Sequence, residues 1–248
     1  MTGGTLYGMA SVFLTARWQH LLFLNYRVDR ALLSRFVPRG TELDLLDGDA
    51  LVSIVAFRFL DTRLLGIPVP FHRDFDEINL RAYVRRRDGS GWSRGVVFIR
   101  ELVPRPAIAW TARLAYNEPY RAVRMRHSIQ MDATHGGSLS YEWRQKGSWH
   151  GVHGTVTGAP VPIDPQSATG FITEHYVGYT PQRSGRTVEY QVRHPRWNVW
   201  HNARVGFRCD VGAVYGPEWT DALCAEPISS FVCDGAPVSI SSPRLLPG

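Results

Sequence analysis

The chain has 248 residues, of which 44% are hydrophobic and 20% are charged, so it can bury a sizeable core and lacks the composition of a disordered protein. Its formal net charge is +6, but the basic residues are scattered, and the densest group, residues 85–87, adjoins a predicted hairpin turn. This distribution does not favour a nucleic-acid partner, because nucleic-acid surfaces combine several basic runs with exposed aromatic side chains.

Lysine is almost absent from the chain. Of its 28 basic residues only Lys146 is a lysine, and the others are arginines. An arginine stays protonated and cannot become the neutral amine that attacks a carbonyl carbon. A Schiff-base mechanism would therefore need Lys146, which lies beside a Gly-Ser turn where a solvated charge is the expected role.

The cysteines and the start of the chain indicate a cellular compartment. Cys209, Cys224 and Cys233 are odd in number, widely spaced and without a Cys-x-x-Cys pair, which argues against a disulfide framework or a structural zinc site. The first 14 residues lack a basic region, and Arg17 and His20 interrupt the apolar stretch that follows. We expect a cytoplasmic protein without a membrane partner.

The first half of the chain is predicted to contain strands, tight turns and two short helices. Asp29 can cap a helix that carries apolar residues up to Phe36 and stops at Pro38. Turn sequences follow at residues 47–49 and 88–91. A second helix is predicted to begin at Pro106 and to run to Tyr116.

In the second half of the chain apolar and polar residues alternate with a period of two, which is typical of half-buried antiparallel strands. The pattern covers residues 122–131, 139–143 and 187–193, and turn sequences stand at 135–137, 184–185 and 234–235. Short helices are predicted at 167–176 and 218–225. Short strands joined by tight turns predict a mainly β protein, a barrel or a sandwich, with few helices.

A row of polar residues occupies alternate positions of one predicted strand: Glu77, Asn79, Arg81 and Tyr83. Alternate residues project from the same face of a strand, so these side chains share one face. That face is either the solvated outside of a sheet or the wall of a polar cavity. The pattern leaves both open, because the intervening residues are apolar and can equally pack under covering structure: Ile78, Leu80, Ala82 and Val84.

Two further residues are candidates for binding and catalysis. Arg113, on the predicted helix, can fork onto a ligand carboxylate or pair structurally with Glu77 or Glu118. Tyr120 can donate a hydrogen bond to a carbonyl or enolate oxygen, or it can simply be packed.

The other polar clusters and motifs of the sequence give weaker indications of a function. Residues 174–176, His194 and Trp197 form a second polar and aromatic group, for which hydrogen bonding at strand ends is the simpler interpretation. His150 and His153 are three apart and point to opposite faces of a strand, so they do not predict a metal site. Nucleotide-binding loops and standard nucleophile motifs are absent, and we predict neither a cofactor nor a metal.

Several sequence segments resemble a known family. They are WQHLLFLNYRVD (18–29), ALVSIVAFRF (50–59), FDEINLRAYV (75–84), AWTARL (109–114), PYR (119–121), TEHY (173–176), HPRW (194–197) and SFVCDGAPV (230–238). With them the chain resembles, over nearly its whole length, the YqjF-like family of uncharacterised bacterial proteins, which is grouped with the acetoacetate decarboxylase-like superfamily.

The more distant resemblance to acetoacetate decarboxylase implies an antiparallel, cone-shaped β-barrel with an interior cavity. In that enzyme a reactive lysine and a neighbouring lysine directly follow a proline; here Tyr120 and Arg121 follow Pro119, so both lysines are missing. The decarboxylase's acidic-loop glutamate corresponds to Glu77, whereas its substrate-binding arginine falls near Gln19. The resemblance thus implies that this chain shares the cavity and a carboxylate with the decarboxylase but lacks its reactive lysine amine.

We therefore predict a mainly β fold, a single acetoacetate decarboxylase-like barrel over residues 16–248 with short capping helices, preceded by an N-terminal extension, residues 1–15, that can be disordered. The predicted ligand is a small organic acid or carbonyl compound. If the chain is an enzyme, we expect a lyase or isomerase of a keto or enol acid. The proposed residues are Glu77 and Tyr120 for catalysis and Asn79, Arg81 and Arg113 for substrate binding. Alternatives are a non-catalytic sensor or carrier and a protein-interaction module; a homo-oligomer stays open.

Overall fold

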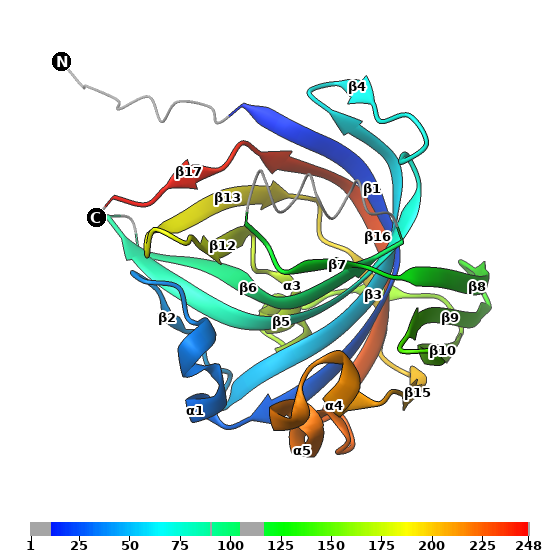
Figure 1. Cartoon of the computed structure of the whole chain (residues 1–248). Helices are drawn as coiled ribbons and strands as arrows, with labels where there is room; N and C mark the ends of the chain where they lie inside the picture. Colours follow the sequence, from blue (N-terminus) through cyan, green and yellow to red (C-terminus); the bar gives the residue numbers. More distant parts are fainter. Residues whose placement is uncertain (1–10, 90, 105–116, 248) are drawn as a thin grey trace.

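The structure is a computed structural model that describes residues 11–89, 91–104 and 117–247. In these ranges the chain consists mainly of strands with a few short helices, as the sequence predicts (Figure 1). No helix of the described ranges is long and apolar enough to cross a membrane.

The long strands of the main sheet close into a ring. They pair in the order β16-β1-β3-β5-β6-β12-β13, and β13 pairs with β16 again through Val192 and Ile240. The pairing is antiparallel except between β12 and β6, which run parallel. The bounds are β1 (Val12–Val28), β3 (Ala50–Leu64), β5 (Phe75–Asp88), β6 (Gly91–Val103), β12 (Val177–Pro181), β13 (Thr187–Arg193) and β16 (Ser229–Ser241).

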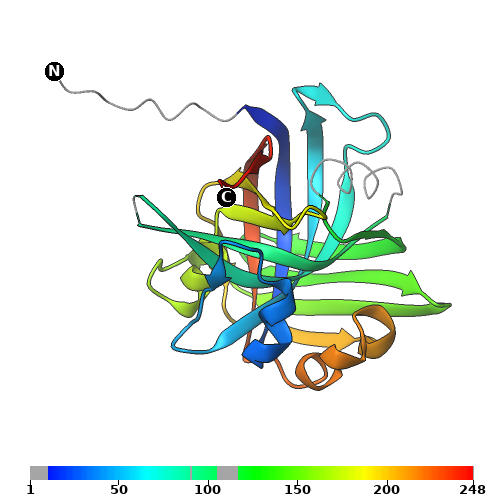
Figure 2. The ribbon, with the colours of Figure 1, turned by 60° about the vertical axis from the view of Figure 1, so that its left-hand side comes forward.

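A second, smaller sheet packs against one side of this ring (Figure 2). It has the order β15-β10-β9-β8, with bounds β8 (Arg124–Asp132), β9 (Gly136–Gln145), β10 (Ser148–Thr157) and β15 (Arg204–Arg208). Tyr141, Trp143 and Val152 point from it into the shared core, where they join apolar side chains of β1, β3 and β5. The predicted alternation along residues 122–131 is thus confirmed, although the strand divides at Val123.

Strand β5 is buried on both faces, and this property positions the site. Ile78, Leu80 and Ala82 belong to the core between the ring and the smaller sheet. Glu77 and Asn79, on the opposite face, are 3% exposed each. The polar row therefore lies inside the ring, not on a wet outer surface.

The remaining elements are short. They are β2 (Glu42–Leu43), β4 (Ile67–Pro68), β7 (Tyr120–Ala122), β11 (Val161–Pro162), β14 (Asn198–Trp200), β17 (Arg244–Leu245), α1 (Arg30–Leu33), α3 (Ala168–Thr173), α4 (Val211–Val214), α5 (Thr220–Leu223) and the 3-10 turns η1 (Ser34–Phe36) and η2 (Pro217–Trp219). Asp29 caps α1 as predicted, accepting a hydrogen bond from the Ala31 amide at 2.8 Å.

The other predicted helices differ in extent. The helix predicted at 167–176 is limited to α3, which Ser167 caps, and the helix predicted at 218–225 divides into η2 and α5. Helix α4, capped by Asp210, was not predicted. The helix predicted at 106–116 lies outside the described residues.

Two predicted boundaries need correction. The turn predicted at Asp234 and Gly235 lies inside β16. Gly235 has a φ of +95°, and a Cβ there would lie 2.1 Å from the carbonyl oxygen of Trp18, so this glycine serves a close approach of two strands. In addition β1 begins at Val12, which pairs with Ser241, so the strand starts within the segment 1–15 that was interpreted as an extension.

Candidate ligand cavity

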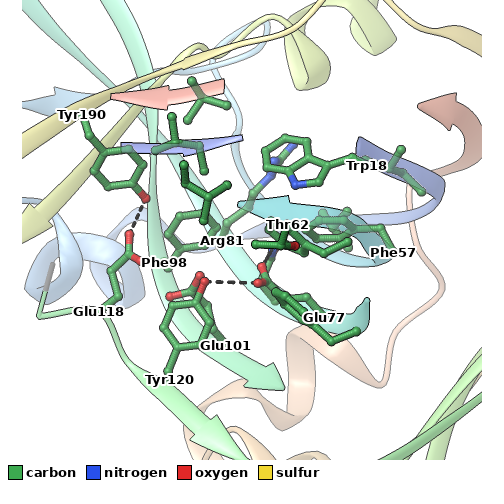
Figure 3. Close-up of a pocket in the computed structure, with 18 of the residues that line it drawn as sticks. Trp18, Phe57, Thr62, Glu77, Arg81, Phe98, Glu101, Glu118, Tyr120 and Tyr190 are labelled. Atoms are coloured by element: carbon green, nitrogen blue, oxygen red, sulfur yellow. Dashed lines mark hydrogen bonds between the residues drawn. The ribbon is translucent and has the colours of Figure 1, made fainter. Parts of the chain in front are cut away.

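The interior of the ring contains a cavity of about 180 Å³ (Figure 3). Strands β1, β3, β5, β6, β13 and β16 supply most of its wall, and the loop around β4 supplies part of its rim. The lining is mainly aromatic and aliphatic. It comprises Phe13, Leu14, Trp18, Leu21, Val55, Phe57, Phe59, Thr62, Leu64, Val69, His72, Phe75, Glu77, Asn79, Arg81, Phe98, Glu101, Glu118, Tyr120, Tyr190, Val192, Trp197 and Ile240.

The cavity brings together four of the residues proposed from the sequence: Glu77, Asn79, Arg81 and Tyr120. The fourth member of the polar row, Tyr83, is buried but does not line the cavity. Its hydroxyl shares a hydrogen bond with Ser53 instead. Of the two interpretations of the row, the cavity wall therefore holds for the first three residues.

Glu77 is held by two hydrogen bonds at the cavity wall. Asn79 Nδ2 donates to its Oε1 at 3.0 Å, and Tyr120 Oη donates to its Oε2 at 3.1 Å. Burial raises the pKa of Glu77 to about 7, while these two hydrogen bonds and the charge of Arg81 act in the opposite direction. Glu77 is thus a buried carboxyl group that both gains and loses a proton near neutral pH.

Two glutamates that were not proposed as site residues complete a cluster. Glu101 on β6 and Glu118 before β7 are 1% and 6% exposed and line the same cavity. Tyr190 Oη donates a short hydrogen bond to Glu118. Burial, then the neighbouring Glu118 and Glu77 charges, raise the pKa of Glu101 well above its usual value; burial raises that of Glu118 to about 8.

Tyr120 lies among these carboxyl groups. It pairs with Glu101 in the parallel ladder between β6 and β7. Burial and the charges of Glu101, Glu77 and Glu118 raise the pKa of its phenol well above the usual value. The phenol therefore keeps its proton and can donate it in a hydrogen bond, which is the property required of a group that stabilises a developing oxyanion.

Arg81 supplies a positive charge to the wall. Its Nη2 donates to the carbonyl oxygen of Ile172 at 3.1 Å, and its guanidinium lies over the rings of Phe23 and Tyr83, at 5.3 and 5.6 Å from their centroids. Its Nε is buried without a hydrogen-bond acceptor. This Nε–H thus has no acceptor among the described residues.

The second polar group of the sequence divides in the structure. The ring of His194 stacks on that of Trp197 with centroids 4.2 Å apart, and Tyr176 donates to Glu174 at 3.0 Å. Trp197 also lines the cavity. His175 belongs elsewhere, since its Nε2 lies 3.1 Å from Asp44 Oδ2.

The other candidates lie apart from the cavity or outside the described ranges. Arg113 is not among the described residues, so its predicted role stays a prediction. Lys146 is exposed at the turn between β9 and β10 and does not line the cavity. His150 is buried and His153 exposed. Within the described ranges no group of three or more His, Cys, Asp and Glu side chains could hold a metal ion.

Comparison with known proteins finds a family match over most of the chain. Residues 15–237 match the DUF2071 family, described as an uncharacterized conserved protein (COG2071). A curated relative is the uncharacterized protein YqjF of Bacillus subtilis, which is 28% identical over 183 residues. The alignment covers 72% of this chain and 72% of YqjF.

Solved structures with the same fold are acetoacetate decarboxylase-like. An acetoacetate decarboxylase-like enzyme from Sphingomonas wittichii has a TM-score of 0.65 and 14% identity, with 99% of each chain covered. Acetoacetate decarboxylase from Legionella pneumophila has a TM-score of 0.63 and 13% identity, covering 100% of this chain and 92% of its own. The enduracididine biosynthesis enzyme MppR, complexed with pyruvate, has a TM-score of 0.64 and 13% identity, covering 99% and 94%. At these identities the likeness establishes the fold alone.

Proposed function

The chain belongs to the DUF2071 family of uncharacterized conserved proteins, and we propose that it binds a small organic acid or carbonyl compound in the interior cavity and moves a proton on it. The observation that carries this proposal is Glu77, a buried carboxyl group on the wall of a mainly apolar cavity, hydrogen-bonded to a phenol. A base inside an apolar cavity is the arrangement that proton abstraction next to a carbonyl needs.

The roles follow from the contacts. Glu77 takes and returns the proton, because the pKa of about 7 leaves both of its forms populated at neutral pH. Tyr120 donates a hydrogen bond to the oxygen that gains charge, and Asn79 holds Glu77 in place. Arg81 attracts the carboxylate or carbonyl oxygen of the ligand through its available Nε–H. Such chemistry belongs to a lyase or an isomerase.

The proposal does not use covalent amine chemistry. The single lysine of the chain, Lys146, is exposed and is not among the described lining residues, and arginine cannot form the Schiff base. The fold of acetoacetate decarboxylase is thus proposed to serve a reaction in which acid and base groups act without a covalent intermediate.

A second candidate function is that of a non-catalytic sensor or carrier. The lining is dominated by aromatic and aliphatic side chains, including Trp18, Phe57, Phe59 and Phe75, which would enclose an apolar metabolite without needing chemistry.

A screen followed by isotope exchange distinguishes these functions. Melting temperatures are measured with keto acids, hydroxy acids and short acyl compounds, for the wild type and Glu77→Gln, because a ligand of the native state raises the melting point. Compounds that bind are then incubated in deuterium oxide. Deuterium entering next to the carbonyl in the wild type, with loss in Glu77→Gln, supports the catalytic function; binding without exchange supports the carrier.

A further inference from the structure

Carboxyl groups outnumber basic groups among the described residues of the cavity wall. Among the described lining residues, Glu77, Glu101 and Glu118 face Arg81. The other titratable groups of the lining are Tyr120, Tyr190 and His72, and His72 lies on the rim, where its Nδ1 is 2.8 Å from the Pro70 carbonyl oxygen. If all three carboxyl groups ionised, their charge would exceed that of the single guanidinium. A cation bound beside these carboxyl groups would favour their ionised forms.

Hydrogen-bond acceptors without a donor lie in the same wall. Oε2 of Glu101 and Oδ1 of Asn79 are buried and accept no hydrogen bond, and the two residues are 1% and 3% exposed. They are cross-strand neighbours in the pairing of β5 with β6. A buried acceptor without a donor costs about 1–3 kcal/mol. A ligand with N–H groups would supply the missing hydrogen-bond donors and recover this free energy.

Donors without an acceptor lie at another part of the cavity. The indole Nε1 atoms of Trp18 and Trp197 and Nε of Arg81 are buried without a partner, and all three residues line the cavity. Figure 3 shows Trp18 on the opposite side of the drawn pocket from Glu118 and Tyr190. The wall therefore has a donor side near Trp18 and an acidic acceptor side near Glu118.

The aromatic rings of the lining also suit a positive charge. The rings of Trp18 and Phe57 meet edge to face with centroids 5.2 Å apart, and Phe59 stacks on Phe75 at 4.6 Å. The faces of such rings attract ammonium and guanidinium groups. Carboxyl groups beside aromatic rings form a recognition site for an organic cation.

We infer that the natural ligand carries both a protonated amine or amidine, bound at Glu101 and Glu118, and an oxygen acceptor, bound at Trp18 and Arg81. This inference rests on the proposed function, since it concerns the same cavity, and it narrows the organic acids and carbonyl compounds to those that also bear a cationic nitrogen. The carbonyl oxygen would face the donors, and Glu77 would lie between the two ends.

Cation binding must release protons. Burial raises the pKa of Glu118 to about 8, so this group holds a proton at pH 7, and burial with the charges of Glu118 and Glu77 raises the pKa of Glu101 in the same direction. A bound ammonium group replaces these protons, because it stabilises the ionised carboxylates. A bound anion has the opposite effect and favours proton uptake.

Three probes of one shape test the inference: benzylamine, benzyl alcohol and benzoate. A cavity of about 150 Å³ takes benzene in another protein, so single-ring probes suit a volume of about 180 Å³. Calorimetric titration at pH 7 in two buffers of different ionisation enthalpy gives both the affinity and the number of protons released. We expect benzylamine to bind at least about tenfold more tightly than benzoate, with proton release.

Glu101→Gln is the test variant, and Glu226→Gln, which alters an exposed glutamate that does not line the cavity, is its matched control. We expect Glu101→Gln to weaken benzylamine binding about tenfold and to reduce proton release, with benzyl alcohol unaffected. Melting curves of both variants establish that they fold.

The outcomes separate the two proposals. Binding of benzoate or benzyl alcohol in preference to benzylamine would overturn the inferred cation and leave the ligand cavity standing. Benzylamine binding that Glu101→Gln leaves unchanged would also overturn it. Failure of all three probes to bind would contradict the inference and the proposed cavity function together.

Discussion

Tyr120 Oη donates a hydrogen bond to Glu77 Oε2 at 3.1 Å, although 43 residues separate them in the sequence. Strand β7, which carries Tyr120, pairs in parallel with β6, and β6 pairs with β5, which carries Glu77. The hydrogen bond therefore reaches from β7 to β5, the two strands that flank this part of β6. It couples a proton acceptor to a donor inside one cavity.

Removing this hydrogen bond is predicted to raise the pKa of Glu77 further. The Tyr120 hydrogen bond stabilises the ionised carboxylate and so lowers the pKa, which burial has raised to about 7. In Tyr120→Phe we expect the Glu77 carboxyl carbon, followed by carbon NMR with labelled glutamate, to titrate at higher pH. Tyr176→Phe, which removes a hydrogen bond to Glu174 instead, should leave this titration unchanged.

Stability is predicted to fall as the pH rises from 6.5 to 8. Glu118 has a usual pKa of 4.5 and a folded pKa of about 8, so its folded form keeps a proton that the unfolded chain has lost. This stabilising contribution is complete below pH 4.5 and disappears as the pH passes 8. Below pH 6.5 His175, whose pKa burial lowers to about 4, acts in the opposite direction.

Calorimetric melting temperatures at pH 6.5 and 8 test this prediction. Glu118→Gln should reduce the fall in melting temperature between pH 6.5 and 8, because glutamine has no proton to lose. Glu226→Gln should show the same fall as the wild type. An equal decrease in both variants would show that Glu118 is ionised in the folded protein at pH 6.5.

Gly178→Ala is predicted to displace Tyr190. The two residues are cross-strand neighbours of β12 and β13, and a Cβ on Gly178 would lie 2.1 Å from Cζ of the Tyr190 ring. The displaced phenol would lose its hydrogen bond to Glu118. We expect a destabilisation of about 1–3 kcal/mol in urea unfolding and a higher Glu118 pKa. Gly212→Ala is the control, because the nearest atom to a Cβ on Gly212 would be 3.7 Å away, and we expect it to leave the stability unchanged.

Filling the cavity is predicted to abolish ligand binding. Val55 of β3 lines the cavity and is 1% exposed, so Val55→Trp would occupy the ligand's space at a cost of about 1–3 kcal/mol. Compounds that raise the melting temperature of the wild type should then have no effect. Val161→Trp, at a position that is 50% exposed, should respond as the wild type does. A persisting shift in Val55→Trp would locate binding elsewhere.

The sequence predicts the strands and half of the site, and the reasons for its failures are local. Alternation along β5 places Glu77, Asn79 and Arg81 on one face. Both faces of β5 are buried, so the alternation alone could not decide whether this face lines a cavity or the outside of the sheet. The resemblance to a barrel family supported the cavity. Glu77 was thus found by family and pattern together.

Glu101 escaped prediction because of a β-bulge. The pairing of β6 with β5 shifts between Leu80 and Arg81, which lie opposite Arg100 and Phe98. The extra residue lets Phe98 and Glu101 line the same cavity although they are three apart, which regular alternation forbids. The available sign was the pair Arg100 and Glu101 in the otherwise apolar run near the end of β6. Glu118 had been considered only as a structural partner of Arg113.

We propose that Glu77 exchanges a proton near neutral pH inside a ligand cavity, and titration of the Glu77 carboxyl group measures this exchange. Carbon NMR spectra of protein labelled at the glutamate carboxyl carbons are recorded from pH 4 to 9 for the wild type and Glu77→Gln, and the missing signal assigns Glu77. The account predicts a midpoint at about 7. A midpoint at the usual value of 4.5 would contradict it, because Glu77 would then be an ordinary ionised carboxylate.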